Sequence, residues 1–317
     1  LMCHPIDKRI VGKEHGIILF KGLCMGVAEI IPGISGGTIA FLLGIYQPFI
    51  QSIRSINRTF VKHLFSMRLR DALNTVAWKF LLLLFVGMFM AIISLSHLIS
   101  WLIDTHPTIV FSFFFGLILA TGPIIARIVD AWTTPKVLVF LGSGIATFFL
   151  VGMVPINTPN DPWFILICGA IAISAMILPG ISGSFILLIL GKYHYILDSV
   201  NHRDFVTIGI FVIGIILGIL TFVRVLSWLF LKYHDMTLCV LTGFVLGSLN
   251  KIWPWKKTIS TIVGRHGELI PIEQINQWPA TYNLYFFIAL MAMILGFTLA
   301  LIFNRCHKDT FRGLNNA

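Results

Sequence analysis

The residues best suited to chemistry in this chain belong to a Pro-Gly-Ile-Ser-Gly segment that occurs twice, at 32–36 and at 179–183. Proline and glycine interrupt a helix, and glycine lets backbone and ligand approach closely. A following serine or threonine can cap the next half-helix, whose free N–H groups and positive dipole end bind anions. We therefore expect a phosphate or carboxylate site at Ser35, Gly36, Gly37, Thr38, Ser182, Gly183 and Ser184. The alternative is a pair of kinks for close helix packing; two copies in register favour the site.

Three ionisable residues lie inside apolar runs, where charge is costly and usually functional. Arg224 is the predicted side-chain ligand for the anion, because its fork of donors fits phosphate oxygens; the alternative is a structural pair with Glu29 or with backbone carbonyls. Glu29, one turn before the first Pro-Gly, is predicted to exchange a proton or bind Na⁺, or to pair with a cation. His97 aligns with Arg224 and is either a proton relay or a histidine hydrogen-bonded within the bundle.

Other site chemistries are disfavoured by the composition. Five cysteines are scattered without metal-ligand spacing, so we expect neither a metal site nor a disulfide framework. We expect no cofactor other than a coupling H⁺ or Na⁺. The net charge of +10 is spread through the connections between apolar runs, which argues against a nucleic-acid partner. The sequence predicts no particular oligomeric state.

The composition also indicates that these residues lie in a membrane protein. Hydrophobic residues make up 57% of the chain and charged residues 11%, with a mean hydropathy of +0.91, whereas a soluble domain carries about 25% charge. Phe80–Ile103, Phe205–Leu231 and Leu284–Phe303 each reach the roughly 20 apolar residues needed to cross a bilayer. We therefore predict an all-α polytopic membrane protein, with 1–317 as one transmembrane domain.

An internal repeat divides this domain into two halves. Ala28–Ile53 matches Ala175–Val200 at twelve of 26 positions, an offset of 147. The similarity resumes at an offset of 127, where Ser100-Trp101-Leu102 matches Ser227-Trp228-Leu229. Fixed-offset self-similarity is the mark of a duplicated structural unit. The predicted halves are 17–154 and 163–303.

Each half is predicted to be a re-entrant broken-helix hairpin followed by three transmembrane helices. A 15-residue segment before the Pro-Gly rises only about 22 Å, too short for a core of about 30 Å. Non-helical backbone at that depth is tolerated against protein or a water-filled cavity. The hairpins are Ile17–Ile53 and Phe164–Leu197; the spans are Phe80–Ile103, Thr108–Val129, Lys136–Val154, Phe205–Leu231, Met236–Trp253 and Leu284–Phe303.

Three crossings per half is an odd number, so the second half is predicted to be inverted relative to the first. Paired inverted repeats with broken helices are typical of transporters whose sites lie at the membrane midplane. Lys and Arg in the N-terminal stretch, in the connection of roughly 52–79 and in the tail predict that both termini are cytoplasmic. The basic connection 251–282 falls on the predicted outer side and has no assigned role.

Three stretches resemble the bacterial polyprenyl-phosphate transporter family, PopT. They are AEIIPGISGGTIAFLLGIY at Ala28–Tyr46, LPGISGSFILLILGKY at Leu178–Tyr193 and GSLNKIWPW at Gly247–Trp255. The resemblance implies a non-enzymatic translocase that returns undecaprenyl phosphate from the outer to the inner leaflet of the bacterial cytoplasmic membrane, recycling the lipid carrier for peptidoglycan and other envelope polymers. The family's acidic residue before the first Pro-Gly corresponds to Glu29, and its paired Ser-Gly motifs to Ser35-Gly36 and Ser182-Gly183.

This substrate fits the chemistry of the residues. A phosphate head group needs a polar site at the midplane, and a prenyl chain needs an apolar exit between helices into lipid. A small-anion channel or transporter remains an alternative that the motif does not separate from a carrier. A lipid-pyrophosphate phosphatase is less favoured, because such an enzyme needs a nucleophile with a partnered base and the signature serines have no histidine nearby in sequence.

Overall fold

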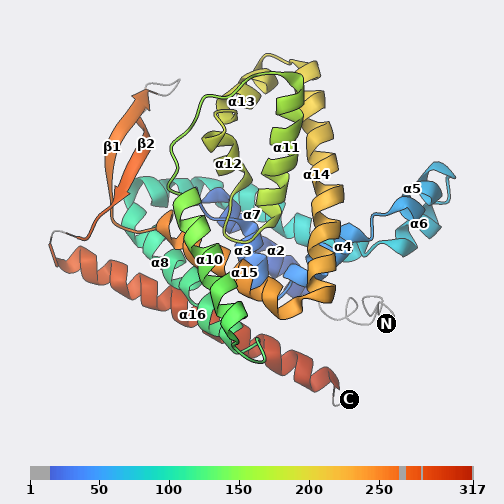
Figure 1. Ribbon diagram of the computed structural model, residues 1–317. Coiled ribbons are helices and arrows are strands. Elements are labelled where there is room, and N and C mark those ends of the chain that lie inside the picture. The colour runs from blue at the N-terminus through green and yellow to red at the C-terminus, as the bar shows by residue number, and fades with distance from the viewer. Residues whose placement is uncertain (1–14, 264–268, 280, 316–317) are drawn as a thin grey trace.

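The computed structural model describes residues 15–263, 269–279 and 281–315, and these are helical except for the connections and one β-hairpin (Figure 1). In the first half the helices are α2 His15–Ile30, α3 Gly36–Leu42, α4 Tyr46–Arg54, α5 Arg58–Phe65, α6 Leu69–Thr75, α7 Trp78–Thr105, α8 Pro107–Leu119, α9 Thr121–Ala126 and α10 Thr134–Leu150. In the second half they are α11 Pro162–Ile177, α12 Gly183–Ile189, α13 Tyr193–Asn201, α14 Phe205–Lys232, α15 His234–Gly247, the 3₁₀ helix η1 Ser248–Asn250 and α16 Leu284–Asn315.

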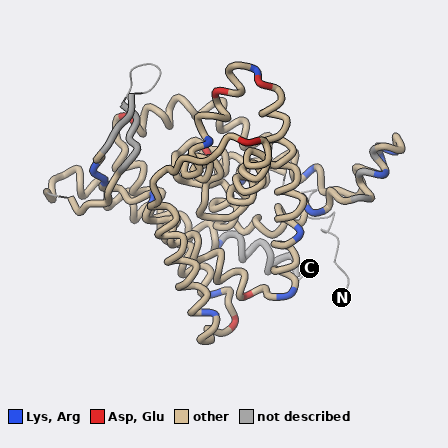
Figure 2. Tube along the Cα trace, turned by 45° about the horizontal axis from the view of Figure 1, so that its top comes forward, with Lys and Arg blue, Asp and Glu red and all other residues tan. Residues whose placement is uncertain are grey.

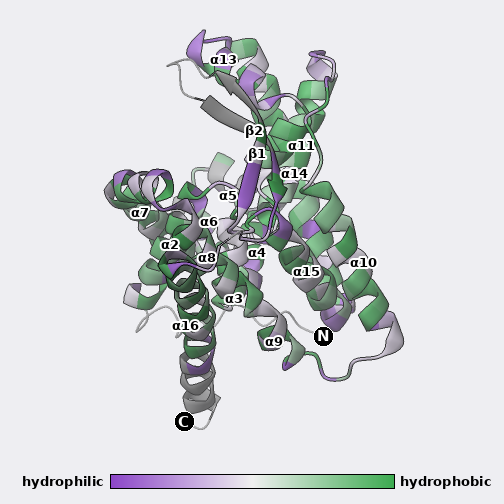
Figure 3. Ribbon diagram, turned by 90° about the vertical axis from the view of Figure 1, so that its left-hand side faces the viewer, coloured by the Kyte–Doolittle hydropathy of each residue, from purple (hydrophilic) through white to green (hydrophobic). Residues whose placement is uncertain are grey.

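Four helical segments are long and apolar enough to cross a membrane: α7, Pro107–Ala126 across α8 and α9, α14, and Leu284–Arg305 within α16. Hydrophobic residues predominate along these helices (Figure 3). The chain is therefore a mostly helical membrane protein, as its composition predicts. Two of the predicted spans correspond to shorter helices, since α10 has 17 residues and α15 has 14.

The duplication is visible in the order and bounds of the helices. α2, α3 and α4 recur as α11, α12 and α13 at an offset of 147, and α7 and α8 recur as α14 and α15 at an offset of 127. α7 and α14 both contain 28 residues. The two Pro-Gly signatures end α2 and α11 at equivalent points, as expected for residues that cannot continue a helix. The inverted orientation and the re-entrant path through a membrane stay predictions.

Within each half, the helix before the signature packs along the long helix that follows. The contact uses equivalent glycines, since a Cβ at Gly87 would meet the carbonyl oxygen of Leu19, and one at Gly214 would meet that of Leu166. α2 and α7 therefore form one closely packed pair, and α11 and α14 form its repeat. Small residues permit this backbone approach, which drives helix association in lipid.

The remaining helices are exchanged between the halves. α8 of the first half packs against α16 of the second, while α15 of the second half packs against α10 of the first. Equivalent glycines again permit the contact: Gly116 faces the carbonyl oxygen of Met293, and Gly243 faces that of Phe140. The two halves thus interlock into one bundle, whose buried core draws side chains from both.

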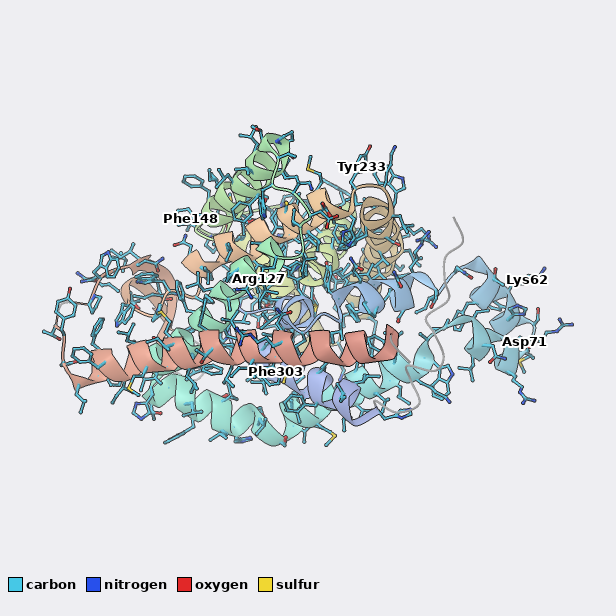
Figure 4. The ribbon with its side chains drawn as sticks, turned by 90° about the horizontal axis from the view of Figure 1, so that it is seen from below. Lys62, Asp71, Arg127, Phe148, Tyr233 and Phe303 are labelled. Atoms are coloured by element: carbon cyan, nitrogen blue, oxygen red, sulfur yellow. The ribbon has the colours of Figure 1, made fainter. Side chains whose placement is uncertain are left out.

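Polar features lie at the edges of this bundle. Charged residues gather in connections and at helix ends (Figure 2). The basic connection 251–282 contains an antiparallel hairpin of β1 Lys256–Val263 and β2 Leu269–Asn276, with Lys256 paired to Asn276. α5 and α6, which carry Lys62 and Asp71, pack mainly on each other and extend away from the bundle (Figure 4).

Candidate functional site

The first signature is closed by its own side chains. The backbone N–H of Gly36 donates to Oε1 of Glu29 at 2.8 Å, and that of Gly37 donates to Oγ of Ser35 at 3.2 Å. Ser35 is the N-cap of α3, and serine is among the best residues for that position. A Cβ at Gly36 would lie 2.7 Å from Oε1 of Glu29, so glycine is needed for the carboxylate to reach the backbone.

The first signature is also bonded to the second. The N–H of Gly180 donates to the hydroxyl of Thr38 at 2.8 Å, and the hydroxyl of Tyr46 donates to the carbonyl oxygen of Ile177 at 3.0 Å. Thr38 and Tyr46 are both buried. The structure therefore brings the two predicted anion-binding segments together, but the polar side chains of the first are already occupied within the protein.

The second signature has the same backbone and different side-chain partners. Gly33 and Gly180 have positive φ angles of 86° and 92°, a conformation that glycine adopts at little cost. At the position equivalent to Glu29 stands Met176, which has no carboxylate to place on α12. The hydroxyls of Ser182 and Ser184 lie 2.8 Å apart and bond to each other, while Ser182 makes no side-chain cap.

Accessibility separates the two signatures further. Ser35 is 2% exposed, whereas Ser182 is partly exposed and Ser184 is exposed. Two hydroxyls that bond only to each other can both turn to a new acceptor, because each oxygen carries a rotatable hydrogen. Of the seven predicted signature residues, Ser182 and Ser184 are thus the ones whose side chains remain available.

An apolar cavity of about 370 Å³ begins beside the second signature. It runs between α14 and α15 to their junction, where Tyr233 stands (Figure 4). Leu178, next to the second Pro-Gly, lines one end together with Phe244, whose carbonyl oxygen faces Gly180. The surface that lines it is entirely apolar, and the hydroxyl of Thr237 is bonded to the carbonyl oxygen of Tyr233 within the helix.

Lys251, the first residue of the basic connection 251–282, lies against both signatures. The Cγ atom of Lys251 is 3.1 Å from the Cβ position of Gly33, and its Nζ is 4.3 Å from the ring centroid of Phe185, the residue after Ser184. The available signal was the motif GSLNKIWPW at Gly247–Trp255. Hydropathy does not indicate that this part of the loop folds back onto Gly33 and Phe185.

Comparison with known proteins adds the family. Residues 25–270 match a family model described as VCA0040-like, undecaprenyl phosphate translocase-like. A polyprenyl-phosphate transporter of Vibrio cholerae serotype O1 is 43% identical over 263 residues, 83% of this chain and 85% of that protein. A polyprenyl-phosphate transporter of Staphylococcus aureus is 30% identical over 308 residues, 91% of this chain and 96% of that protein.

The chain belongs to the undecaprenyl phosphate translocase-like family. This confirms the resemblance drawn from the signature motifs, and with it a transporter rather than an enzyme. No solved structure matches the chain.

Two further residues predicted for the site lie on the long helices α7 and α14. Arg224 is exposed on α14, where its guanidinium donates to the carbonyl oxygen of Leu220 in the same helix. His97 is exposed on α7. In the described structure neither is joined to a signature by a hydrogen bond or an ion pair, so their roles as ligand and relay stay predictions. Glu29 is placed in the first signature, where its observed role is to cap α3.

Proposed function

We propose that this transporter carries undecaprenyl phosphate from the outer to the inner leaflet of the bacterial cytoplasmic membrane. The observation that carries the proposal is the difference between the signatures. The first holds its own carboxylate, Glu29, on the backbone N–H of Gly36. The second has the same backbone without a carboxylate and presents Ser182 and Ser184 instead. Because no carboxylate of the protein occupies the second signature, this signature suits an anion that comes from outside the protein.

The head group is proposed to bind at the second signature. A phosphate monoester is an acceptor with three strong oxygens and a charge near −2, and serine hydroxyls are neutral donors that can turn toward it. Ser182, Gly183 and Ser184 are the proposed contacts. Ser35, Gly36, Gly37 and Thr38 shape the facing wall of the site, because their polar groups are already bonded within the protein.

The prenyl chain is proposed to follow the apolar cavity between α14 and α15. That cavity starts at Leu178, four residues before Ser182, so a lipid could place its phosphate at the signature and its first isoprene units along the cavity. Burying apolar chain contributes about 25 cal/mol per Å². Recognition of both ends would distinguish a polyprenyl phosphate from a small inorganic anion.

Topology and coupling complete the proposal. Two inverted repeats, each with a re-entrant hairpin, would place the signatures near the midplane and both termini in the cytoplasm, as the Lys and Arg distribution predicts. H⁺ or Na⁺ is proposed to couple through Glu29, because protonation or cation binding would compete with its bond to Gly36 and loosen α3. Arg224 and His97 are then secondary candidates for charge movement.

The experiment is transport in proteoliposomes containing undecaprenyl phosphate. An impermeant phosphatase added outside hydrolyses the head groups in the outer leaflet, and further hydrolysis reports lipid that has crossed. Hydrolysis should go to completion with the protein and stop near half without it, and a proton or Na⁺ gradient should change the rate. A matched variant with Ser182 and Ser184 both replaced by alanine should lose most of this transport while keeping its fold.

Two outcomes would redirect the proposal. If lipid crosses no faster than in protein-free vesicles while chloride leaks, the protein is a small-anion channel or transporter. If undecaprenyl pyrophosphate is instead hydrolysed without added phosphatase, the protein is an enzyme. Either result overturns the carrier.

A further inference from the structure

The side chain of Lys251 occupies the space between the two signatures. It leaves the turn after η1, passes Gly33 of the first signature at 3.1 Å from that residue's Cβ position, and places Nζ 4.3 Å from the ring of Phe185. Phe185 stands where the first repeat has Thr38, and its ring faces the ammonium instead of bonding across to the other signature. A positive charge is thereby held beside the α12 residue that follows Ser184.

The backbone under this lysine is fixed from several sides. The N–H of Lys251 donates to the carbonyl oxygen of Ser248 at 2.9 Å, and the ammonium of Lys256 donates to the carbonyl oxygen of Lys251. The amide of Asn276 on β2 donates to the carbonyl oxygen of Asn250 at 2.9 Å. The β-hairpin therefore positions the turn, which gives the basic connection 251–282 a structural task at the signatures.

Lys251 has no counter-ion within the described part of the chain. The ion pairs found there join Lys136 and His234 to Asp235, and the carboxylate of Glu29 is bonded to Gly36. Lys251 is only partly exposed, and a partly desolvated ammonium is costly unless an anion or hydrogen-bond acceptor meets it. The ring of Phe185 supplies a weaker cation–π contact that leaves the ammonium's three donors unused.

The charge of Lys251 has no equivalent in the first half of the repeat. The position equivalent to Lys251 in the first half is Ile124, which is 3% exposed and packs in the core. The first half thus carries a carboxylate at Glu29 where the second has Met176, and the second half carries an ammonium where the first has Ile124. Both departures make the second half more positive than the first at equivalent positions.

We propose that Lys251 is the cationic ligand for a phosphate monoester bound between the signatures, together with the hydroxyls of Ser182 and Ser184. This inference deepens the proposed function and rests on it for the lipid part of the ligand. The ammonium offsets the negative charge of the head group, and the two hydroxyls donate hydrogen bonds to its oxygens. Hydrogen bonds in which one partner is ionised are stronger than neutral ones. Lys256 supports the site by holding the carbonyl group of Lys251 and by adding a second positive charge nearby.

The test measures binding of undecaprenyl phosphate to the full chain in nanodiscs, with uncharged undecaprenol and inorganic phosphate as separate probes. Lys251→Met should weaken undecaprenyl phosphate binding at least about tenfold and leave undecaprenol binding unchanged. Lys251→Arg should restore part of the affinity. The matched control is Lys257→Met, which removes an exposed lysine from the same connection and should change affinity less than twofold.

A second measurement uses the unmodified protein, so it does not depend on a variant that folds. Undecaprenyl phosphate should protect Lys251 from acetylation, read by mass spectrometry, while Lys257 stays reactive. Equal acetylation of Lys251 with and without the lipid, or unchanged binding by folded Lys251→Met, overturns the inference. Protection by inorganic phosphate at the same concentration would keep Lys251 as a phosphate ligand but overturn the lipid part of the assignment, because the site would then recognise free phosphate.

The outcomes separate this inference from the function it rests on. If the wild-type protein binds undecaprenyl phosphate through Lys251 but moves none of it across a vesicle, the ligand assignment stands and the carrier fails. If the wild-type protein moves the lipid and Lys251→Met moves it equally well, the carrier stands and the ligand assignment fails.

Discussion

The first and second signatures have the same backbone conformation at their glycines. They differ in which polar groups are already hydrogen-bonded within the protein. In the first, Glu29 and Ser35 hold the N–H groups of Gly36 and Gly37. In the second, Met176 cannot do this, and among the described residues the hydroxyls of Ser182 and Ser184 bond to each other. The two copies thus have equivalent loops, and a few side-chain differences support the proposal that the first is a structural wall and the second the phosphate site.

The differences fall on a small number of repeat pairs. Glu29 pairs with Met176, Gly37 with Ser184, Thr38 with Phe185, and Ile124 with Lys251. The second members of these pairs lack the carboxylate of Glu29 and the hydroxyl that Thr38 uses to bond Gly180, and they add the hydroxyl of Ser184 and the ammonium of Lys251. Exchanging members of these pairs is therefore the most direct way to break the comparison.

The largest effect is expected from alanine at the glycines with positive φ. A Cβ at Gly180 would lie 2.6 Å from the carbonyl oxygen of Phe244, whereas one at Gly33 would lie 3.1 Å from the flexible side chain of Lys251. Gly180→Ala should lower the free energy of unfolding by about 2–4 kcal/mol, from left-handed strain plus a backbone clash. Gly33→Ala should cost about 1–2 kcal/mol. Denaturant unfolding in mixed micelles measures both, and a larger loss for Gly33→Ala would contradict the packing described.

The next effect is expected from giving the second signature the carboxylate of the first. Met176→Glu should place an anion against α12, as Glu29 does against α3, and repel the phosphate. Juxtaposed like charges cost several kcal/mol, so affinity for undecaprenyl phosphate should fall about a hundredfold with little change in stability. Met176→Gln is the uncharged control and should bind nearly as wild type. Unchanged affinity in the Met176→Glu protein would mean that the lipid binds elsewhere.

A smaller effect is expected from the serines, and its kind should differ between signatures. Replacing Ser182 and Ser184 by alanine should slow transport about tenfold, because hydrogen bonds to a charged ligand are lost, and should leave stability nearly unchanged. Ser35→Ala should instead cost about 1 kcal/mol of stability through loss of the α3 cap. Transport per folded molecule should then stay near wild type. Equal transport losses in the two proteins would remove the distinction between wall and site.

The smallest effect is expected from pH. Burial, with the charge of Lys251 beside it, lowers the pKa of Lys256 to about 8. Raising the pH from 7 to 9 therefore removes a positive charge near the site, and affinity for the phosphate lipid should fall about threefold. Lys251 is the charged group that faces Lys256 among the described residues; Phe111 of α8 contributes a neutral ring. Lys256→Met should flatten this dependence, and a drop of the same size in that variant would assign it to another group.

Much of the fold could be predicted from the sequence because it depends on local patterns. Apolar length identifies α7, α14 and α16, and the repeated Pro-Gly identifies the interruptions that end α2 and α11. The packing of α8 and α15 against helices of the other half could not be predicted from such local patterns. Lipid-facing helices are apolar all round, so hydropathy does not indicate which neighbour a helix selects; glycines such as Gly116 and Gly243 do so through close contacts.

The candidate site was predicted in part. The signature serines and Glu29 stand out because polar residues beside Pro-Gly in an apolar run have few structural explanations. Their division into occupied and available groups depends on tertiary bonds, such as that of Gly180 to Thr38. The position of Lys251 could not be predicted, because a lysine after a spanning helix normally indicates topology. Only the folded turn brings its side chain to Gly33.

The central claim is that the phosphate binds at the second signature and not the first. A structure of the full chain in a nanodisc with bound undecaprenyl phosphate tests it most directly. Phosphate density is expected in contact with Ser182, Ser184 and the ammonium of Lys251, with Glu29 still bonded to Gly36. Density on α3 with Glu29 displaced, or a head group held by Arg224 away from both signatures, would contradict it.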